Sequence, residues 1–388
     1  MTTGLADRVA VVSAAGTGFS RDAGRSRLAL AVDAATAAIG QAGLRGTDID
    51  GICARGVTAP MMQAALGIPG ISYWCDATVG GFPQAFLQAV YAIHAGACRH
   101  ALVVQSVVRL PYQSRAAAAD PFRRLEYVEP PRLRGLTPAG DLMAGPVGYA
   151  AWAARYLHEY GCDREDFGLV AVNSRSNAID NDHAVFRTPL TMEEYRRAPI
   201  VHAPFGLLDM DVPVDGAHAF VLTTADRAGS LADRPVLVHA AAMGGIDRQL
   251  DQTAGLTQHG QHVVADALRA RSDLWLADFN VVYTYDGFSW LTLMWLEALG
   301  WCGPGEAPKF LRDHWNDATN RVLIGGRVPV NTHGGSLSEG ATQGSGHLHE
   351  AVVQLQGRAG TRQVTGATTA LVVPGGIFHN PHGFVFHV

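Results

Sequence analysis

Residues able to do acid–base chemistry gather in one glycine-rich segment, NTHGGSLSEGATQGSGHLHEA, at positions 331–351. Glycine lets a backbone approach a ligand closely. Histidine changes its charge near neutral pH, which suits proton transfer. His333 is therefore a candidate acid or base, although a loop histidine facing solvent or the core explains it equally well. His347 is a second candidate, with capping or packing of the following helix as the simpler explanation.

A second candidate group lies in the aromatic run YTYDGFSWLTLMW. Tyr285 stands where a strand is expected to end, and its phenol can donate a hydrogen bond to a developing oxyanion or move a proton. Tyr283 lies on the same face if the strand continues, but it reads more simply as an ordinary strand tyrosine. Asp286 can orient a neighbour, yet an Asp just before a helix is first of all a helix N-cap.

The cysteines give little sign of metal or redox chemistry. The five are Cys53, Cys75, Cys98, Cys162 and Cys302. None belongs to a CxxC or Cys/His pair at zinc spacing, so free thiols and no structural metal site are predicted. Cys75, in YWCDAT, is the one alternative nucleophile, and it reads as a bystander.

Composition excludes several classes of protein. The 388 residues are 48% hydrophobic and 17% charged, with a formal charge of −5. No basic stripe is present to neutralise phosphates, which argues against a nucleic-acid partner. No run of eighteen apolar residues and no signal-peptide pattern occurs, so we expect a cytoplasmic protein that does not enter a membrane.

The elements that must position these residues follow an alternating order. The first block predicts strands at 8–16, 47–54 and 100–108, and helices at 26–43 and 80–96. This βαβαβ order predicts a mostly parallel sheet covered by helices. Residues 107–205, rich in Pro and Arg, read as a large insertion or cap. It carries helices at 146–160 and 164–180, and the aromatics of the first (Trp152, Tyr156, Tyr160) suit an interface or a helix core.

A second block repeats the first in outline. After a strand at 219–224 returns to the first sheet, the second block predicts strands at 234–245, 279–284 and 367–376, and helices at 260–271, 288–300 and 346–356. Two αβ blocks of similar order suggest an internal duplication. We therefore predict an N-terminal half at 1–228, containing the insertion, and a C-terminal half at 229–388.

Four separated stretches together resemble a known family. They are SRLALAVDAATAAIGQAGLRGTDIDGI, AVYAIHAG followed by ALVV, DMDVPVDGAHAFVLTTADRA, and VPVNTHGGSLSEGATQGSGHLHEAVVQLQGRAG. The chain resembles the thiolase superfamily, in its sterol-carrier-protein-x or lipid-transfer branch. The resemblance implies an α/β thiolase fold: two duplicated αβαβα halves forming a five-layered core, with an inserted loop domain. It also implies a homodimer.

Set on the family's motifs, the chain departs at each thiolase catalytic position. The acyl-accepting cysteine falls on Val79, before the helix 80–96. The Asn or His that holds the thioester oxygen falls on Tyr285, the Gly-His-Pro histidine on Ala341, and the second cysteine on Val373. A thiolase mechanism with a covalent cysteine is therefore not expected.

Within the branch, the resemblance is to the steroid side-chain-cleaving aldolases, which lack these residues as well. They carry a tyrosine at the position of Tyr285, and a second catalytic tyrosine where this chain has Ala341. The resemblance implies retro-aldol cleavage of a β-hydroxyacyl coenzyme A thioester, or its reverse, with another acid or base such as His333. Two alternatives stay open: a thiolase-like acyltransferase or condensing enzyme, and a non-catalytic subunit that binds acyl-CoA.

The resemblance also implies binding positions and a partner. A thioester pocket is expected at Val79, Gly80, Asp286, Gly334, Gly335, Ala341, Gly344 and Gly346. The backbone amides around Ser345 can bind an oxyanion or simply form a tight turn. His349 and Glu350 read as packing and solvent-facing residues. No covalently bound cofactor is expected, and the implied partner is a separate small subunit with a zinc ribbon and an OB fold.

Overall fold

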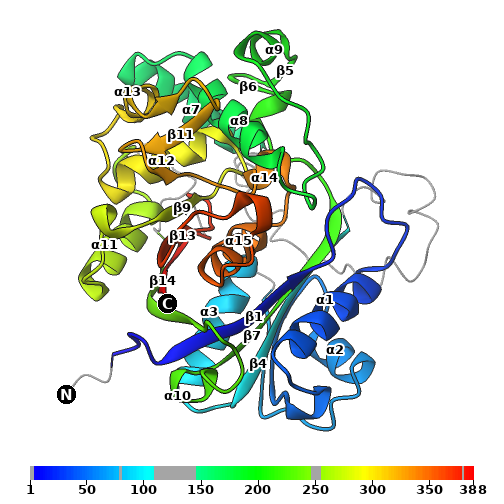
Figure 1. Ribbon diagram of the computed structural model, residues 1–388. Helices are drawn as coiled ribbons and strands as arrows, with labels where there is room; N and C mark the ends of the chain where they lie inside the picture. Colours follow the sequence, from blue (N-terminus) through cyan, green and yellow to red (C-terminus); the bar gives the residue numbers. More distant parts are fainter. Residues whose placement is uncertain (1–3, 78–80, 109–145, 246–254, 378–379) are drawn as a thin grey trace, which may run out of the picture.

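The computed structural model describes residues 4–77, 81–108, 146–245, 255–377 and 380–388 (Figure 1). Val79 and Gly80, which the sequence places in a thioester pocket, lie outside these residues. No helix in the described ranges is long and apolar enough to cross a membrane.

The first block forms as its apolar pattern predicts. Its elements are β1 (Val9–Gly16), α1 (Arg27–Gln41), β2 (Gly51–Arg55), α2 (Ala59–Ala65), β3 (Tyr73–Asp76), α3 (Phe82–His94) and β4 (His100–Val108). Ser26 caps α1 by accepting a hydrogen bond from the Ala29 amide at 3.2 Å, which satisfies one of the unpaired donors at a helix start. The sequence missed only the short elements α2 and β3.

The elements predicted for the second block form close to their predicted bounds, whereas its last strand and two short helices were not predicted. After β7 (Asp215–Thr224) and α10 (Ala225–Ala228) complete the first half, the main elements of the second are β8 (Val236–Met243), α11 (Gly260–Arg271), β9 (Val281–Thr284), α12 (Ser289–Leu299), α13 (Ala307–Asp313), α14 (Gly335–Ser338), α15 (Ser345–Leu355), β13 (Thr369–Val373) and β14 (His382–His387). A small sheet of β10 (Trp315–Asn316), β11 (Arg321–Ile324) and β12 (Val328–Pro329) stands apart from the main one.

The prediction of a mostly parallel sheet is wrong. Nine strands form one mixed sheet in the order β3-β2-β4-β7-β1-β8-β14-β13-β9, and only β2 with β3, β2 with β4, and β9 with β13 are parallel. Strands buried on both faces are apolar whichever way they run, so the hydrophobic runs did not reveal direction. The pairing senses of β1-β7-β4-β2 recur in β8-β14-β13-β9, although the domain boundary near 228 stays a prediction.

Three apolar clusters lie between the layers of helices and the two halves of the sheet. The middle one lies between α3, α15 and the inner faces of both halves of the sheet. A second joins α1 and α2 to the outer face of the first half, and a third joins α11 and α12 to the outer face of the second half. The predicted five layers are thus present: helices, sheet, helices, sheet, helices (Figure 1). In the middle layer Phe86 packs edge-on against Phe220, Phe384 and Phe386.

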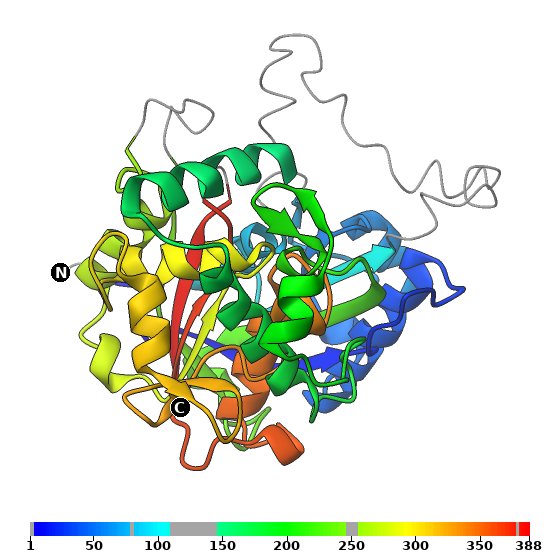
Figure 2. The ribbon, with the colours of Figure 1, turned by 90° about the horizontal axis from the view of Figure 1, so that it is seen from above.

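The insertion covers the second half of the molecule. Its described elements are α7 (Pro146–Tyr160), α8 (Glu165–Ala178), α9 (Met192–Arg197), β5 (Ile200–His202) and β6 (Phe205–Gly206). Figure 2 shows α7 and α8 lying beside α12 and α13, with which they share an apolar cluster. Trp152 and Tyr156 are buried in that cluster, so they are core residues and the interface reading is wrong for them.

Candidate active site

The glycine-rich segment lies in the interior of the molecule. It leaves the end of β12, crosses the C-terminal end of β9, forms α14 and then enters α15. Every residue from Val328 to Leu355 is buried except Gln343. Side chains in this segment therefore act in a low-dielectric environment, where hydrogen bonds and unpaired polar atoms have large energetic consequences.

Helix α8 of the insertion fixes the backbone of this segment. Asn173 and Asn177 both donate side-chain hydrogen bonds to the Val330 carbonyl, at 3.1 and 2.9 Å. Asn181, just after the helix, donates to the His333 carbonyl at 2.8 Å. The sequence analysis missed this support. Its signal is the four-residue spacing of the three asparagines, which places them on one helix face.

Asp286 and His347 form a buried pair at the end of β9. Asp286 Oδ1 accepts from the Ser336 amide at 2.7 Å and lies 3.1 Å from His347 Nε2, while Oδ2 accepts from the Ser174 hydroxyl at 3.2 Å. An ionised carboxylate only accepts, so His347 carries its proton on Nε2 and leaves a lone pair on Nδ1. That Nδ1 has no hydrogen-bond partner among the described residues.

Asp286 does not cap the helix that follows it, α12, contrary to the prediction. The N-cap position of α12 is Phe288, which makes no side-chain capping bond. The carboxylate turns away toward Ser336 and His347 because these donors come from α14 and α15, which sequence proximity cannot reveal.

Four aromatic rings form a line through the site. Ring centroids are 5.8 Å apart for Tyr285 and His347, 4.7 Å for His347 and His333, and 5.7 Å for His333 and Tyr283. Tyr285 is half-buried and the other three are buried. The sequence therefore named four residues that the fold does bring together, and only Tyr285 keeps exposed surface.

The two tyrosines do not share a face. Strand β9 ends at Thr284, just before Tyr285. Tyr285 packs against the cluster that α7 and α8 share with α12 and α13, and against the cluster of α11 and α12, whereas Tyr283 packs in the middle layer. The Tyr283 hydroxyl hydrogen-bonds the Thr332 hydroxyl at 3.0 Å, and burial raises the pKa of its phenol well above the usual value. Tyr283 is thus a supporting core residue in this geometry.

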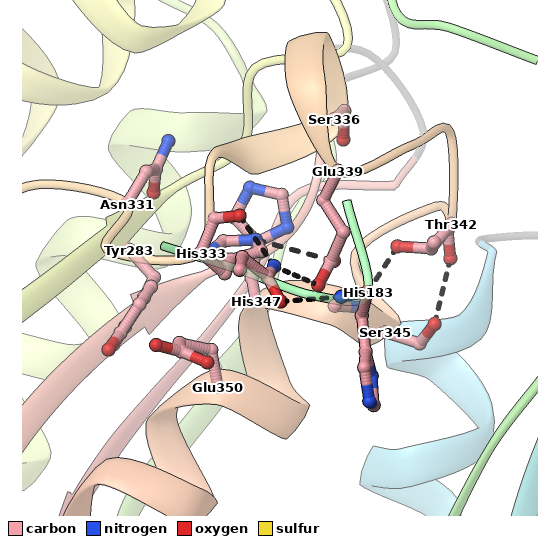
Figure 3. A network of polar contacts seen from close by, with 12 residues as sticks. His183, Tyr283, Asn331, His333, Ser336, Glu339, Thr342, Ser345, His347 and Glu350 are labelled. Carbon is pink, nitrogen blue, oxygen red and sulfur yellow. Dashed lines mark hydrogen bonds and ion pairs between the residues drawn. The ribbon is translucent and has the colours of Figure 1, made fainter. Parts of the chain in front are cut away.

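Glu339 is a buried acid that the sequence analysis did not name. Its Oε1 accepts from Asn181 at 3.0 Å, and its Oε2 lies 3.9 Å from His333 Nε2 (Figure 3). Burial raises the pKa of Glu339 to about 8 and holds the pKa of His333 well below its usual value. A protonated carboxyl group and a neutral imidazole therefore face each other at neutral pH.

Glu350 is not solvent-facing, contrary to the prediction. It is buried, and its carboxylate accepts hydrogen bonds from Arg362 Nη2 at 2.9 Å and from the Thr332 hydroxyl at 2.9 Å. This ion pair holds α15 under Tyr283, on one side of the histidines in Figure 3.

The turn before α15 uses its own backbone amides. The Ser345 amide donates to the Thr342 carbonyl at 3.2 Å, and the Gly346 amide to the Thr342 hydroxyl at 3.0 Å. Of the two readings of this turn, the geometry favours the tight turn over an oxyanion site. His218, also missed by the sequence analysis, contacts the Ser345 hydroxyl through Nδ1 at 2.9 Å and stacks on His349 at 4.5 Å.

Comparisons with known proteins agree with this geometry. The chain is 33% identical to the 17-hydroxy-3-oxo-4-pregnene-20-carboxyl-CoA lyase of Mycobacterium tuberculosis, over 96% of this chain and 97% of the other. It is also 33% identical to a steroid side-chain-cleaving aldolase of Thermomonospora curvata, over 96% of each. The solved Ltp2-ChsH2(DUF35) aldolase superposes with a TM-score of 0.82 at 30% identity, covering 99% of this chain and 98% of that chain.

The chain belongs to the thiolase superfamily, in its lipid-transfer branch. Residues 245–387 match the family model described as thiolase C-terminal domain-like. Over nearly its full length the chain is a homologue of aldolase-type carbon–carbon lyases. Its mixed α/β sheet is the thiolase-like fold that the sequence resemblance implied.

The positions at which a thiolase acts carry no thiol in this family member. Ala341 and Val373 are buried aliphatic residues, and the Ala341 amide donates to the Val212 carbonyl at 2.8 Å. Cys75 lies in β3, where burial and the neighbouring Asp76 raise the pKa of its thiol. A nucleophilic cysteine needs the opposite shift, toward thiolate, so the surroundings of Cys75 disfavour that role.

Gly335 has no room for a side chain, because the Asp286 carboxylate lies against its backbone. Gly335 has φ of +60°, and a Cβ there would lie 1.9 Å from Asp286 Oδ2. We predict that Gly335→Ala lowers the free energy of unfolding by at least about 3 kcal/mol, because strained backbone adds to displacement of a buried carboxylate. Urea unfolding monitored by circular dichroism measures the loss.

Gly326→Ala is the matched control for Gly335→Ala. Gly326 also has positive φ, +73°, but a Cβ there meets nothing within 4 Å. Its substitution should cost about 1–2 kcal/mol, the backbone penalty alone. Equal losses in the two variants would show that the contact with Asp286 does not matter.

Glu339 should make stability depend on pH. The folded protein holds a proton on Glu339 up to about pH 8, whereas the unfolded chain releases it near pH 4.5. The free energy of unfolding therefore falls as pH rises through this window, by about 1.4 kcal/mol per pKa unit of difference. We predict that Glu339→Gln unfolds at a urea midpoint that falls less between pH 5.5 and 8 than that of the unsubstituted protein.

Buried histidines do not disturb this comparison. Burial lowers the pKa of His218 to about 3, and this group destabilises the fold only as pH falls below 6.5. It is present in both proteins, so its effect cancels in the difference. The exposed Glu159→Gln serves as control and should follow the unsubstituted protein. Parallel curves for Glu339→Gln and the unsubstituted protein would contradict a buried, protonated Glu339.

Proposed function

We propose that this protein cleaves a β-hydroxyacyl coenzyme A thioester by a retro-aldol reaction, releasing a carbonyl compound and a shorter acyl-CoA. The observation that carries the proposal is the half-buried Tyr285 ring beside His347, whose proton is held on Nε2 by Asp286. One oxygen donor next to one imidazole acceptor meets both chemical needs of the reaction. The names of its relatives support the same reaction class.

In the proposed reaction, His347 Nδ1 accepts the proton of the substrate's β-hydroxyl. The electron pair left on that oxygen forms the carbonyl π bond, the Cα–Cβ bond breaks, and its electron pair enters the thioester as an enolate. Tyr285 donates a hydrogen bond to the enolate oxygen, where negative charge develops. The proton held by His347 then returns to Cα. Atoms and charge balance without an added thiol or a redox partner.

The other polar groups act through these two residues. Asp286 is a positioning residue, because it sets the tautomer and stabilises the imidazolium that forms. We assign Glu339 and His333 to the region behind His347, where a protonated carboxyl group can replace a lost proton. His347 is buried, so the hydroxyl of the substrate has to enter beside the exposed edge of Tyr285.

The acyl group is proposed to be large and the enzyme to work in an assembly. One relative is named a lyase of a pregnene carboxyl-CoA, which supports a steroid-sized acyl chain. The aldolase with the superposable structure is named for two components, Ltp2 and ChsH2(DUF35). We propose a homodimer of this chain together with a separate small zinc-ribbon and OB-fold subunit that binds the CoA part.

The test is to incubate the purified chain, with and without the small subunit from a neighbouring gene, with β-hydroxyacyl-CoA and β-ketoacyl-CoA substrates. Mass spectrometry then measures the products. We expect carbonyl release from the hydroxy substrate, unchanged in Cys75→Ser. Loss of turnover in Cys75→Ser with a trapped acyl adduct in the parent would favour an acyltransferase. Silence with every substrate and partner would favour a binding subunit.

A further inference from the structure

A cluster of possible metal ligands lies outside the site described above, where the segment before β1 contacts β8 and the last strand, β14. It consists of Asp7, just before β1, His239 in β8 and His387 at the end of β14. One ligand atom from each lies within 4.8 Å of the others. Among the described residues it is the one group of three such side chains close enough to hold an ion.

We propose that Asp7, His239 and His387 bind a zinc ion. His387 Nε2 lies 2.7 Å and His239 Nδ1 lies 3.1 Å from Asp7 Oδ1. Two ligands of one tetrahedral zinc ion stand about 3.3 Å apart when each bond is about 2.0–2.1 Å. All three ligand atoms lie within 4.8 Å of one another, so small side-chain rotations would bring them to this spacing. Two imidazoles and one carboxylate form a donor set that suits zinc.

The second partner of His239 strengthens the proposal. His239 Nε2 lies 2.8 Å from Asp273 Oδ1, close enough for an ion pair. A carboxylate on the outer nitrogen of a ligand histidine is the usual support of a zinc site.

The sheet is locally irregular where it presents His239. Val385 pairs with Ala240 and Phe386 with Val238, so His239 is left over as a bulge in β8. Bulges of this kind redirect a side chain out of the regular alternation of a strand. The three side chains are partly exposed, 41% for Asp7, 12% for His239 and 26% for His387, so an ion can enter and a water can complete its coordination.

Sequence spacing did not predict this site because its ligands come from three distant segments. The chain separates Asp7 and His239 by 232 positions and Asp7 and His387 by 380. A bound ion would tie the segment before β1 to strands β8 and β14, and so join the two halves of the sheet at the β1–β8 pairing. Its role is structural, and it is independent of the proposed lyase reaction.

The experiment is a calorimetric titration of tag-free, chelator-treated protein with zinc chloride. We expect one ion per chain and a melting temperature that rises with zinc. His239→Ala and His387→Ala should each weaken binding at least about tenfold, and Asp273→Asn about tenfold. His94→Ala, an exposed histidine in α3, should leave the affinity unchanged. Magnesium should not compete, because it prefers oxygen ligands.

Two further measurements keep the result unambiguous. Zinc X-ray absorption should show nitrogen and oxygen neighbours at about 2.0–2.1 Å and no sulfur at about 2.3 Å, which excludes binding to the free cysteines. Asp7→Asn changes a residue outside every strand and removes a ligand if the histidine variants fold poorly. An absence of zinc binding, a sulfur shell, or an affinity unchanged in all three ligand variants would overturn the proposal.

Discussion

Tyr285→Phe should lower kcat for retro-aldol cleavage by about 100- to 1000-fold while leaving the fold intact. The substitution removes one hydroxyl from a half-buried ring whose packing against His347 is kept. Loss of one preorganised donor to a developing oxyanion typically has an effect of this size. Because the donor acts mainly on the enolate, KM should change much less than kcat. Steady-state release of the shorter acyl-CoA measures both constants.

Tyr283→Phe is the matched control for this result. Its hydroxyl bonds Thr332 in the middle layer and does not meet the exposed side of the site. We expect kcat within a few-fold of the parent and a loss of stability of about 1 kcal/mol, the net value of one hydrogen bond. The reverse pattern, with Tyr283→Phe inactive and Tyr285→Phe active, would show that Tyr283 is the catalytic tyrosine and Tyr285 is not.

Asp286→Asn should lower kcat by about 100-fold and move the acid limb of the pH–rate profile to lower pH. An asparagine can still accept from Ser336 and His347 and donate to Ser174, so the variant mainly removes a charge. Without that charge the imidazolium formed during the reaction is less stable, and His347 becomes a weaker base. The pH dependence of kcat, measured between about pH 5 and 9, reports this change.

Asp209→Asn provides the corresponding control. Asp209 is a buried carboxylate that accepts from Tyr195, Ser289 and the Gly206 amide, with no histidine partner. Its substitution should reduce stability and leave the shape of the pH–rate profile unchanged. If Asp286→Asn shows only the same loss of stability, its carboxylate supports the fold and not the proposed base.

Elements set by local pattern could be predicted from the sequence. The apolar helix expected at 80–96 forms at Phe82–His94, because glycines at both ends and a continuous apolar face act within a few residues. Strand direction could not be predicted in this way. β7 is antiparallel to both of its neighbours, and that depends on where the long insertion returns the chain.

Individual site residues could be predicted from the sequence, but the hydrogen bonds and contacts between them could not. Tyr285 and His347 were found from motif position and residue type, and the fold places them side by side. Glu339 was missed because a glutamate in a loop looks solvated, until Asn181 and His333 are seen around it. Asp286 was assigned to a helix cap because local rules ignore a donor that arrives from residue 347.

The most direct test of cleavage without an acyl-enzyme is the product balance from a β-hydroxyacyl-CoA in the absence of free coenzyme A. Retro-aldol chemistry predicts one carbonyl product and one shorter acyl-CoA for each substrate consumed, with one solvent deuterium at Cα when the reaction runs in D₂O. Intact-protein mass spectrometry during turnover should show no added acyl mass. Cleavage that requires free coenzyme A, with an acyl group on Cys75, would contradict the proposed mechanism.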